Sequence, residues 1–273
     1  MQNIRGKKAL VTGAATGIGR AIAIALAREG ADLYLVDIDE AGLVATAREA
    51  SGHGVEAVTH ICDLTQSGEI IAMVNALLQR WGRLHILVNN AGAAYYGPTH
   101  AMTAAQWRRI LSVNLLAPIE LVYELLPTLA AQEQAHIVNV CSVFGLVTFR
   151  KGAAYQTSKF GLVGLSAALR AEYSHDGFGV TALCPGFVRT AMIETFATSN
   201  ADQRRHKVPS WACLSADAVA AKAIGAIRNN RGLVVVSLSA RLWWWLARLS
   251  PSFCDWLTRE GWRGKRKLHI VRP

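Results

Sequence analysis

Seven short apolar runs, separated by stretches of helical periodicity, constrain the fold of this chain more than any other feature. The runs are 7–12, 31–36, 55–61, 84–88, 136–141, 179–183 and 232–238. Strands that alternate with helices pair in parallel through right-handed crossovers. The pattern therefore predicts a three-layer, doubly wound α/β fold with a seven-stranded parallel sheet and helices on both faces. We expect 1–238 to form one domain that carries the cofactor and substrate sites, and 239–273 to form a Trp- and Arg-rich helical extension.

The bulk composition is that of a globular intracellular protein. A chain of 273 residues that is 52% apolar has enough length and hydrophobicity for one α/β core. The N-terminus has no apolar signal-peptide segment, and no 18-residue apolar run suggests a spanning helix. The cysteines lie far apart without a Cys-x-x-Cys pair, which indicates buried thiols in the reducing cytoplasm. They are Cys62, Cys141, Cys184, Cys213 and Cys254.

A glycine-rich motif lies between the first strand and the first helix, which is predicted over 20–28. The motif reads TGAATGIG and begins at Thr12. Gly13 permits a tight turn, Gly17 lets the backbone approach a pyrophosphate, and Gly19 lets the helix pack closely. Because the motif stands in a strand–turn–helix context, it predicts a dinucleotide site. Thr16 and Ile18, between these glycines, are assigned to the same site.

Two acidic residues end the second and third strands. Asp37 follows Gly19 by 18 residues and is placed to bind both hydroxyls of an adenosine ribose, so it favours NAD over NADP. No Arg or Lys adjoins it to receive a 2′-phosphate. The alternative is that Asp37 caps the next helix, although Asp39 is better placed for that. Asp63, with Leu64, either contacts the adenine or caps the helix that begins near Gln66.

Amide side chains follow the fourth strand and interrupt the helix after it. Asn90 can fix loop backbone, while Ala91 and Gly92 leave room for a flat ligand. The helix predicted from 103 to about 124 carries Asn114 in an apolar stretch. A buried amide is costly without partners, so Asn114 is either a structural bridge or a site residue.

Tyr155 and Lys159 lie four residues apart on a helix predicted over 152–175, so they project from one face. An ammonium beside a phenol stabilises the phenolate, and the phenol pKa then falls from about 10 toward neutrality. Such a tyrosine can exchange a proton with a substrate oxygen. Ser142 closes the fifth strand and can hold the same oxygen. The spacing alone also fits a solvated helix face.

Together these motifs resemble the short-chain dehydrogenase/reductase family, over about residues 7–238. The matching segments are Thr12-Gly13-x-x-x-Gly17-x-Gly19, Asp63-Leu64-Thr65, Asn89-Asn90-Ala91-Gly92, Asn114, Ser142, Tyr155-x-x-x-Lys159 and Pro185-Gly186. The resemblance implies a single-domain Rossmann oxidoreductase that uses NAD or, less favoured, NADP. It also implies homodimers or homotetramers that pack the Asn114 and Tyr155 helices across an interface.

The resemblance implies a role for each matching residue. Tyr155 would be the general acid/base, and Lys159 would bind the nicotinamide ribose and lower the Tyr155 pKa. Ser142 would orient the substrate oxygen, and Asn114 would hold a water that links Lys159 to solvent. The nicotinamide end would be held by Pro185, Gly186, Val188 and Thr190.

The expected reaction is hydride transfer between a nicotinamide and a hydrophobic secondary alcohol or ketone, such as a steroid, retinoid, acyl or aromatic compound. The residues expected near the substrate are mostly apolar, and several of them have core packing as the alternative. They are Ala94, Tyr95, Ser142, Phe144, Phe187, Met192 and Phe196. Arg189 leaves an anionic substrate open, and 190–209 is expected to be a mobile flap. The rival functions are a non-catalytic dinucleotide-binding regulator and a membrane-associated interaction protein. Scattered histidines predict no metal site.

The extension carries much of the positive charge. The chain has a net charge of +10, and residues 241–273 hold eight Arg/Lys against two Asp/Glu. Pro251 is expected to divide the segment into two helices. One apolar stripe recurs at helical spacing, while Trp243 and Trp244 fall outside it; the stripe is Leu242, Trp245, Leu246, Leu249, Phe253, Trp256 and Leu257. We expect either peripheral membrane contact or packing at the substrate mouth or a partner subunit, and no nucleic acid.

Overall fold

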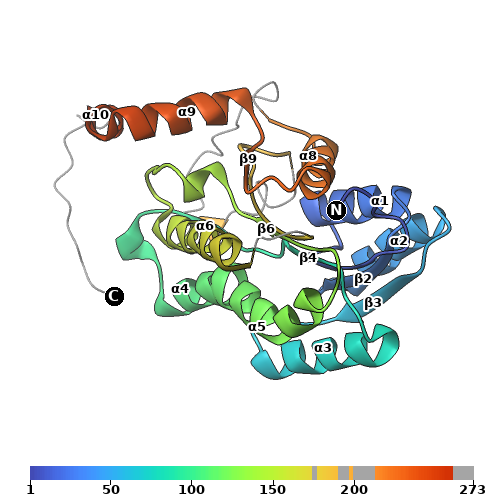
Figure 1. Cartoon of the computed structure of the whole chain (residues 1–273). Coiled ribbons are helices and arrows are strands. Elements are labelled where there is room, and N and C mark those ends of the chain that lie inside the picture. The colour runs from blue at the N-terminus through green and yellow to red at the C-terminus, as the bar shows by residue number, and fades with distance from the viewer. Residues whose placement is uncertain (174–176, 190–196, 199–212, 261–273) are drawn as a thin grey trace.

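The sheet confirms the predicted architecture. The computed structural model describes residues 1–173, 177–189, 197–198 and 213–260. Seven parallel strands follow the order β3-β2-β1-β4-β6-β7-β9 (Figure 1). Their bounds are β1 Lys8–Thr12, β2 Asp32–Asp37, β3 Ala57–Ile61, β4 Ile86–Asn89, β6 Ala135–Val140, β7 Phe178–Cys184 and β9 Leu233–Val235. Each lies in or overlaps a predicted run, because strands buried on both faces read as continuous apolar segments.

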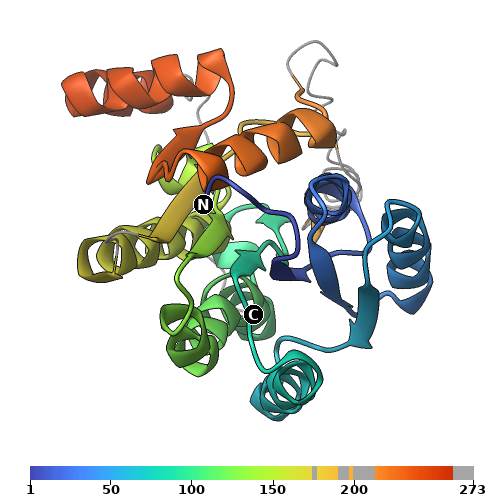
Figure 2. The ribbon, with the colours of Figure 1, turned by 45° about the vertical axis from the view of Figure 1, so that its right-hand side comes forward.

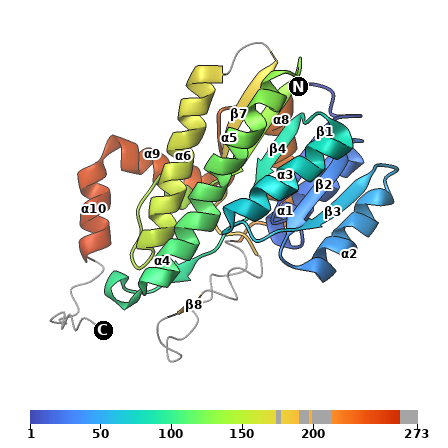
Figure 3. The same ribbon diagram turned by 90° about the horizontal axis from the view of Figure 1, so that it is seen from below.

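Helices cover both faces of the sheet (Figure 3). On one face lie α1 (Gly17–Arg28), α2 (Glu40–Ser51) and α8 (Ala216–Arg228), which share a core cluster. On the other lie α3 (Ser67–Trp81), α5 (Ala117–Ala130) and α6 (Ala153–Tyr173). Short elements complete the described chain: β5 (Tyr95–Tyr96) with β8 (Ala197–Thr198), and the 3₁₀ turns Thr99–Ala101 and Val143–Gly145.

The helix that carries Asn114 is longer than predicted and is not uniform. It begins as α4 (Ala104–Leu111), where Thr103 and Gln106 form a capping box, and passes through a π-helical segment, Ser112–Leu116, into α5. Among the described residues, Ala104–Ala130 is the one helix long and apolar enough to cross a membrane. However, Leu121, Leu125 and Leu129 are buried in the cluster that packs on the sheet, so this helix serves as a core helix.

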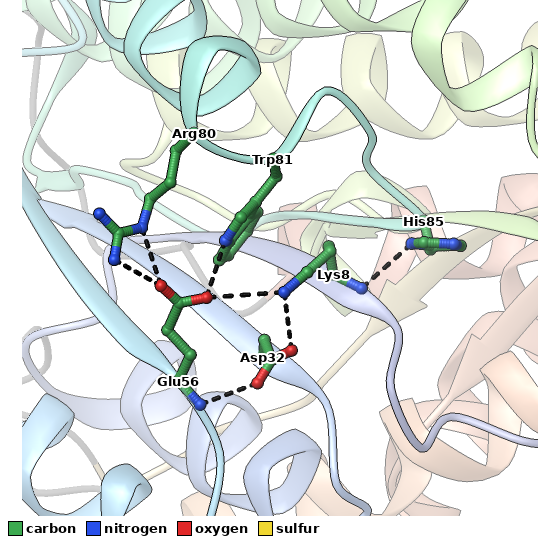
Figure 4. A network of polar contacts seen from close by, with 6 residues as sticks. All are labelled: Lys8, Asp32, Glu56, Arg80, Trp81 and His85. Carbon is green, nitrogen blue, oxygen red and sulfur yellow. Dashed lines mark hydrogen bonds and ion pairs between the residues drawn. The ribbon is translucent and has the colours of Figure 1, made fainter.

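A network of hydrogen bonds and ion pairs lies at the end of the sheet where the strands begin (Figure 4). The Glu56 carboxylate accepts hydrogen bonds from Arg80 and from Trp81 Nε1, the latter at 2.9 Å. Lys8 Nζ lies 2.8 Å from Asp32 Oδ2 and 3.5 Å from Glu56 Oε2. These bonds connect β1, β2 and the residue before β3 to the end of α3, so the strand starts are held in register away from the carboxyl ends.

The C-terminal extension forms two helices, α9 (Leu238–Leu249) and α10 (Pro251–Glu260), which confirms the break at Pro251. They extend beyond the edge strand β9, at the opposite end of the molecule from α2 and α3 (Figure 2). One predicted boundary was wrong: the last strand ends at Val235 rather than at 238, because the Ser237 hydroxyl caps α9 by accepting a hydrogen bond from Ala240 N. Trp243 and Trp244 lie outside the stripe as predicted, and they are the rings that pack against the core.

Candidate active site

A cleft of about 650 Å³ opens at the carboxyl ends of the strands. It brings together twelve of the residues assigned to the cofactor from the sequence: Gly13, Thr16, Gly17, Ile18, Asp37, Asp63, Leu64, Asn90, Ala91, Gly92, Tyr155 and Lys159. Parallel sheets bind ligands at this edge, where the loops that follow the strands converge. The cleft therefore unites side chains that lie up to 146 positions apart in the sequence, from Gly13 to Lys159.

The glycine motif forms a turn that only glycine fits at two positions. Gly13 has φ +64°, and a Cβ there would lie 2.8 Å from the Cα of Ala91. At Gly19 a Cβ would meet the Gly13 carbonyl oxygen at 2.0 Å, so this glycine packs α1 against the turn itself. Helix α1 also begins at Gly17, inside the motif, and not at residue 20 as predicted.

Thr12 and Asn90 lock this turn to the strand beside it. Asn90 Nδ2 donates to the carbonyl oxygens of Thr12 and Gly13 at 3.0 and 3.1 Å. The Thr12 hydroxyl in turn accepts the N–H groups of Asn90 and Ala91. Thr12 therefore supports the cleft from behind rather than lining it. The N-terminus of α1 has no side-chain cap and no acidic residue in its first turn, so its N–H groups suit a pyrophosphate.

Asp37 lies at the end of β2 and does not cap α2. Its Oδ2 accepts Ala15 N at 3.0 Å, and its Oδ1 accepts the N–H groups of Ile38 and Asp39. Asp39 is the N-cap, accepting Gly42 N at 3.1 Å. The capping alternative for Asp37 is thereby excluded, and its carboxylate lines the cleft beside Ile38.

Asp63 also lies in the cleft and is not the helix cap. Its Oδ1 accepts Thr65 N at 2.9 Å in a local turn, while Gln66 is the N-cap of α3. Sequence reasoning missed several other lining residues, namely Ile38, Cys62, Thr65, Arg108, Arg109, Ser112, Val113, Val140 and Cys141. The spacing of Arg108 to Ser112 and of Arg109 to Val113, one helical turn each, was the available signal. The two arginines place cations at the cleft, although no Arg or Lys adjoins Asp37 in the sequence.

Asn114 is a structural bridge. It is fully buried in the π-helical segment, and its Nδ2 donates to Ala93 O at 2.9 Å and to Ser158 Oγ at 3.0 Å. Its Oδ1 accepts Ala93 N at 2.7 Å. Both amide hydrogens are used, so the side chain fastens the Ala93 loop to α6. The relay water expected at Asn114 remains a prediction.

Tyr155 and Lys159 line the cleft, and the buried Ser142 lies beside Tyr155 without lining it. Lys159 Nζ is 5.8 Å from the centre of the Tyr155 ring, which confirms that the two share one helix face. The same Nζ donates to Val140 O at 2.8 Å, so the end of β6 positions the buried ammonium. The Tyr155 and Ser142 hydroxyls are hydrogen-bonded, and Ser142 Oγ also accepts Phe144 N at 3.1 Å.

The electrostatics of Tyr155 differ from the expectation. Burial raises the pKa of Tyr155 to about 12, and the hydrogen bond with Ser142 pulls it down only in part. Burial also lowers the pKa of Lys159. The predicted direction was wrong because desolvation disfavours both charged forms, and Lys159 faces the phenol ring across 5.8 Å while bonding a carbonyl oxygen. In this geometry the phenol keeps its proton at neutral pH.

On the substrate side the aromatic residues form one cluster. The Phe144 ring lies 4.0 Å from Phe149 and 5.6 Å from Phe187, centre to centre, and Phe187 is partly exposed. Tyr95 is buried against Ile110 and Ala154.

The remaining assigned residues lie outside the cleft or outside the described residues. Pro185 O accepts Val143 N at 2.8 Å, Gly186 adjoins Ser237, and Val188 is buried in the core. Ala94 lies just beyond the cleft-lining Ala93. Thr190, Met192, Phe196 and most of the segment 190–209 lie outside the described residues.

Comparisons with known proteins agree with this geometry. A family model described as short chain dehydrogenase matches residues 7–201. Granaticin polyketide synthase putative ketoacyl reductase 1 of Streptomyces violaceoruber is 39% identical over 188 residues, which are 68% of this chain and 69% of that protein. A short-chain dehydrogenase/reductase from Burkholderia phymatum in complex with NAD superposes with a TM-score of 0.82 at 28% identity, covering 93% of this chain and 96% of that one.

A second solved structure carries the other cofactor. A variant of actinorhodin polyketide ketoreductase with NADPH superposes with a TM-score of 0.74 at 31% identity, covering 86% of this chain and 97% of that one. The family match extends over more than half of this chain, and the catalytic and glycine motifs lie inside the matched residues. The chain belongs to the short-chain dehydrogenase/reductase family, and it is an NAD(P)-dependent oxidoreductase that acts on CH–OH or ketone groups.

Proposed function

We propose that this protein is an NAD-preferring enzyme that reduces hydrophobic ketones and, in the reverse direction, oxidises the corresponding secondary alcohols. The observation that carries the proposal is the position of Tyr155 and Lys159 in a cleft that also contains the glycine turn and Asp37, with Ser142 hydrogen-bonded to Tyr155. The apolar ring cluster of Phe144, Phe149 and Phe187 beside Ser142 supports a hydrophobic substrate. Two of the similar proteins are a putative ketoacyl reductase and a polyketide ketoreductase, which supports a ketone substrate.

The chain's own residues would bind, orient and protonate. The glycine turn and the α1 N-terminus would hold the pyrophosphate, and the bound nicotinamide would supply the hydride. The Ser142 hydroxyl would orient the carbonyl oxygen. Tyr155, which keeps its proton because burial raises its pKa to about 12, would donate that proton to the oxygen. Lys159 would bind the ribose hydroxyls from its position above Val140.

The cofactor preference rests on Asp37. A carboxylate in the cleft at the end of β2 repels a 2′-phosphate, and three backbone N–H groups hold this one in place. Arg108 and Arg109, across the same cleft, leave NADP as the alternative. Comparing kcat/KM with NADH and NADPH decides between the two.

We also propose a cytoplasmic homo-oligomer that packs α5 and α6 across its interface. Tyr123 is 77% exposed, and Leu116, Ile119 and Phe160 also present apolar side chains to solvent. Such a patch on neighbouring helices is typical of an isologous contact. Light scattering of the wild type and of Tyr123→Glu tests it, since a charge there should favour the monomer.

The experiment for the reaction follows NADH absorbance with a panel of hydrophobic ketones, using Tyr155→Phe as the test variant. Turnover should fall by about two to four orders of magnitude, while cofactor binding persists. Tyr96→Phe, which keeps the ring that stacks on Phe149, is the matched control and should retain activity. Wild-type kcat in Tyr155→Phe would overturn the assignment. NADH binding without turnover on any ketone would favour the regulator instead.

A further inference from the structure

Helix α9 divides its large apolar residues between two faces. Toward the core, Trp243, Trp244 and Ala247 pack against the cluster that contains Val143 and Phe144, and Ala240 is buried. Away from the core, Leu242, Trp245 and Leu249 are 63%, 55% and 78% exposed. The inner face is sufficient to dock the helix, so the outer one is not needed for folding.

The exposed apolar residues of α9 lie on one side of the helix. Leu238, Leu242, Trp245 and Leu249 recur at intervals of four, three and four residues, which places them on one side of α9. On α10, Phe253 and Trp256 are also exposed, and their rings stack at 5.8 Å. We call these six residues the outer stripe. Isolated exposed apolar residues are ordinary, but four on one side of α9 together with two stacked rings on α10 mark a contact surface.

Charge decides among the partners that would cover this surface. Residues 241–273 contribute +6 and the rest of the chain about +4 toward its net charge of +10. Within 241–260 the sequence has Arg241, Arg248 and Arg259 against Asp255 and Glu260, so a second copy of this chain would bring the same net positive charge to the contact. An anionic surface complements it, and tryptophan with arginine favours the headgroup region of a bilayer, where an apolar layer lies directly beneath.

We propose that the outer stripe binds the surface of an anionic phospholipid bilayer. The outer stripe would enter the interface while Trp243 and Trp244 remain docked on the enzyme. Arg241 and Arg248 are exposed on the same helix; Arg241 Nε donates to Val235 O at 2.8 Å and the Arg248 guanidinium lies 5.5 Å from the Trp244 ring centre, and their remaining N–H groups would meet the lipid phosphates. The extension is thus a membrane-binding module whose lipid-facing and protein-facing residues are separated by helix geometry.

Helix α9 lies next to the part of the active site that contains Ser142 and Phe144. Ser237 caps α9, and a Cβ at Gly186 would lie 2.9 Å from its hydroxyl oxygen. The inner tryptophans share a cluster with Phe144, next to Ser142. Membrane binding would therefore bring the Ser142 side of the site toward the bilayer, which suits a ketone dissolved in lipid. This consequence rests on the proposed function, whereas the binding itself does not.

The test is co-sedimentation of the full-length protein with vesicles of phosphatidylglycerol or of phosphatidylcholine. The wild type should bind the anionic vesicles, and more weakly at high salt. The double variant Leu242→Glu, Leu249→Glu should bind at least about tenfold more weakly, because both changes place charge in the apolar layer. Ile71→Glu changes an exposed apolar residue on α3, which lies on the opposite side of the molecule from α9 (Figure 1); it is the matched control and should bind as the wild type does.

Fluorescence sharpens the same test. Vesicles should shift the tryptophan emission to the blue; Trp245→Phe should reduce the shift, and Trp244→Phe should leave it intact. Equal vesicle binding by the wild type and the double variant would overturn the proposal. So would equal affinity for both lipids, or a fall in oligomer mass in the double variant without any vesicle binding.

A separate activity measurement distinguishes failure of the proposed reaction from failure of the proposed membrane binding. The double variant should reduce a water-soluble ketone with NADH at the wild-type rate, since neither substituted residue touches the cleft. If no form of the protein reduces any ketone, the proposed function fails and the vesicle result still stands.

Discussion

The sheet and the C-terminal extension use similar apolar side chains in opposite ways. In the sheet, Leu10, Leu87 and Ile137 have no exposed surface, because helices cover both faces. In α9, Leu242 and Leu249 point away from the protein while two tryptophans fasten the helix. Both faces of a central strand are covered, so all of its side chains are buried. A helix at the edge of the molecule packs on one side only, so its other side is exposed. Apolar composition alone therefore does not tell core from contact surface.

The largest expected difference between the two regions is in stability. Leu87→Ala should lower the free energy of unfolding by about 2–5 kcal/mol, because it leaves a cavity in a packed core. Leu242→Ala, in the outer stripe, should change it by less than about 0.5 kcal/mol. Chemical denaturation of both variants measures this. Equal losses would mean that the extension is part of the cooperative core.

The core around the sheet also contains buried polar side chains, and substitution of Asn114 tests how much they stabilise the protein. Asn114→Ala should cost about 1–3 kcal/mol, since Ala93 and Ser158 lose the bonds at 2.7–3.0 Å that fasten them. The control is Asn229→Ala, whose exposed amide bonds only Gly225 O, and it should lie within about 0.5 kcal/mol of the wild type. Urea denaturation compares them, and a neutral Asn114→Ala would remove the bridge from this account.

Within the extension, neighbouring rings should differ. Trp244→Ala should weaken the docking of α9 by about 1–2 kcal/mol, because its ring packs on the core cluster. Trp245→Ala should be nearly neutral in the absence of membrane. Limited proteolysis of the extension measures the docking. Faster cleavage in Trp245→Ala than in Trp244→Ala would reverse the two faces assigned here.

The smallest effect is expected in the pH profile. The Tyr155 phenol, whose pKa partial burial raises to about 12, should stay protonated, so kcat for ketone reduction should change by less than about twofold between roughly pH 6 and 9. Steady-state rates across that range test it. A loss of rate with a midpoint near neutrality would show that Lys159 lowers the phenol pKa after all.

Local pattern was enough to predict much of this molecule. The strand runs were visible because a strand buried on both faces leaves no polar alternation. The glycine turn followed from its spacing between a strand and a helix, and Asp39 was recognised as the better cap. Tyr155 and Lys159 were placed on one face because helix geometry alone sets that relation.

Other features depended on contacts between distant segments. Asn114 reaches Ala93 and Ser158, which lie 21 and 44 positions away. Arg108 and Arg109 line the cleft because α4 packs beside it, a position that the sequence does not reveal. The direction of the Tyr155 pKa shift followed from burial, which no spacing reveals.

The sequence by itself thus determined the order of strands and helices, the glycine turn and the Tyr155–Lys159 pair, because each depends on periodicity within one segment. Only the tertiary structure decided which side of α9 faces the protein. The helix repeat allows either side, and the choice came from how well Trp243 and Trp244 fit the cluster beside Ser142. The direction of the Tyr155 pKa shift and the partners of Asn114 were also decided by the tertiary structure, because both depend on how distant elements pack around these side chains.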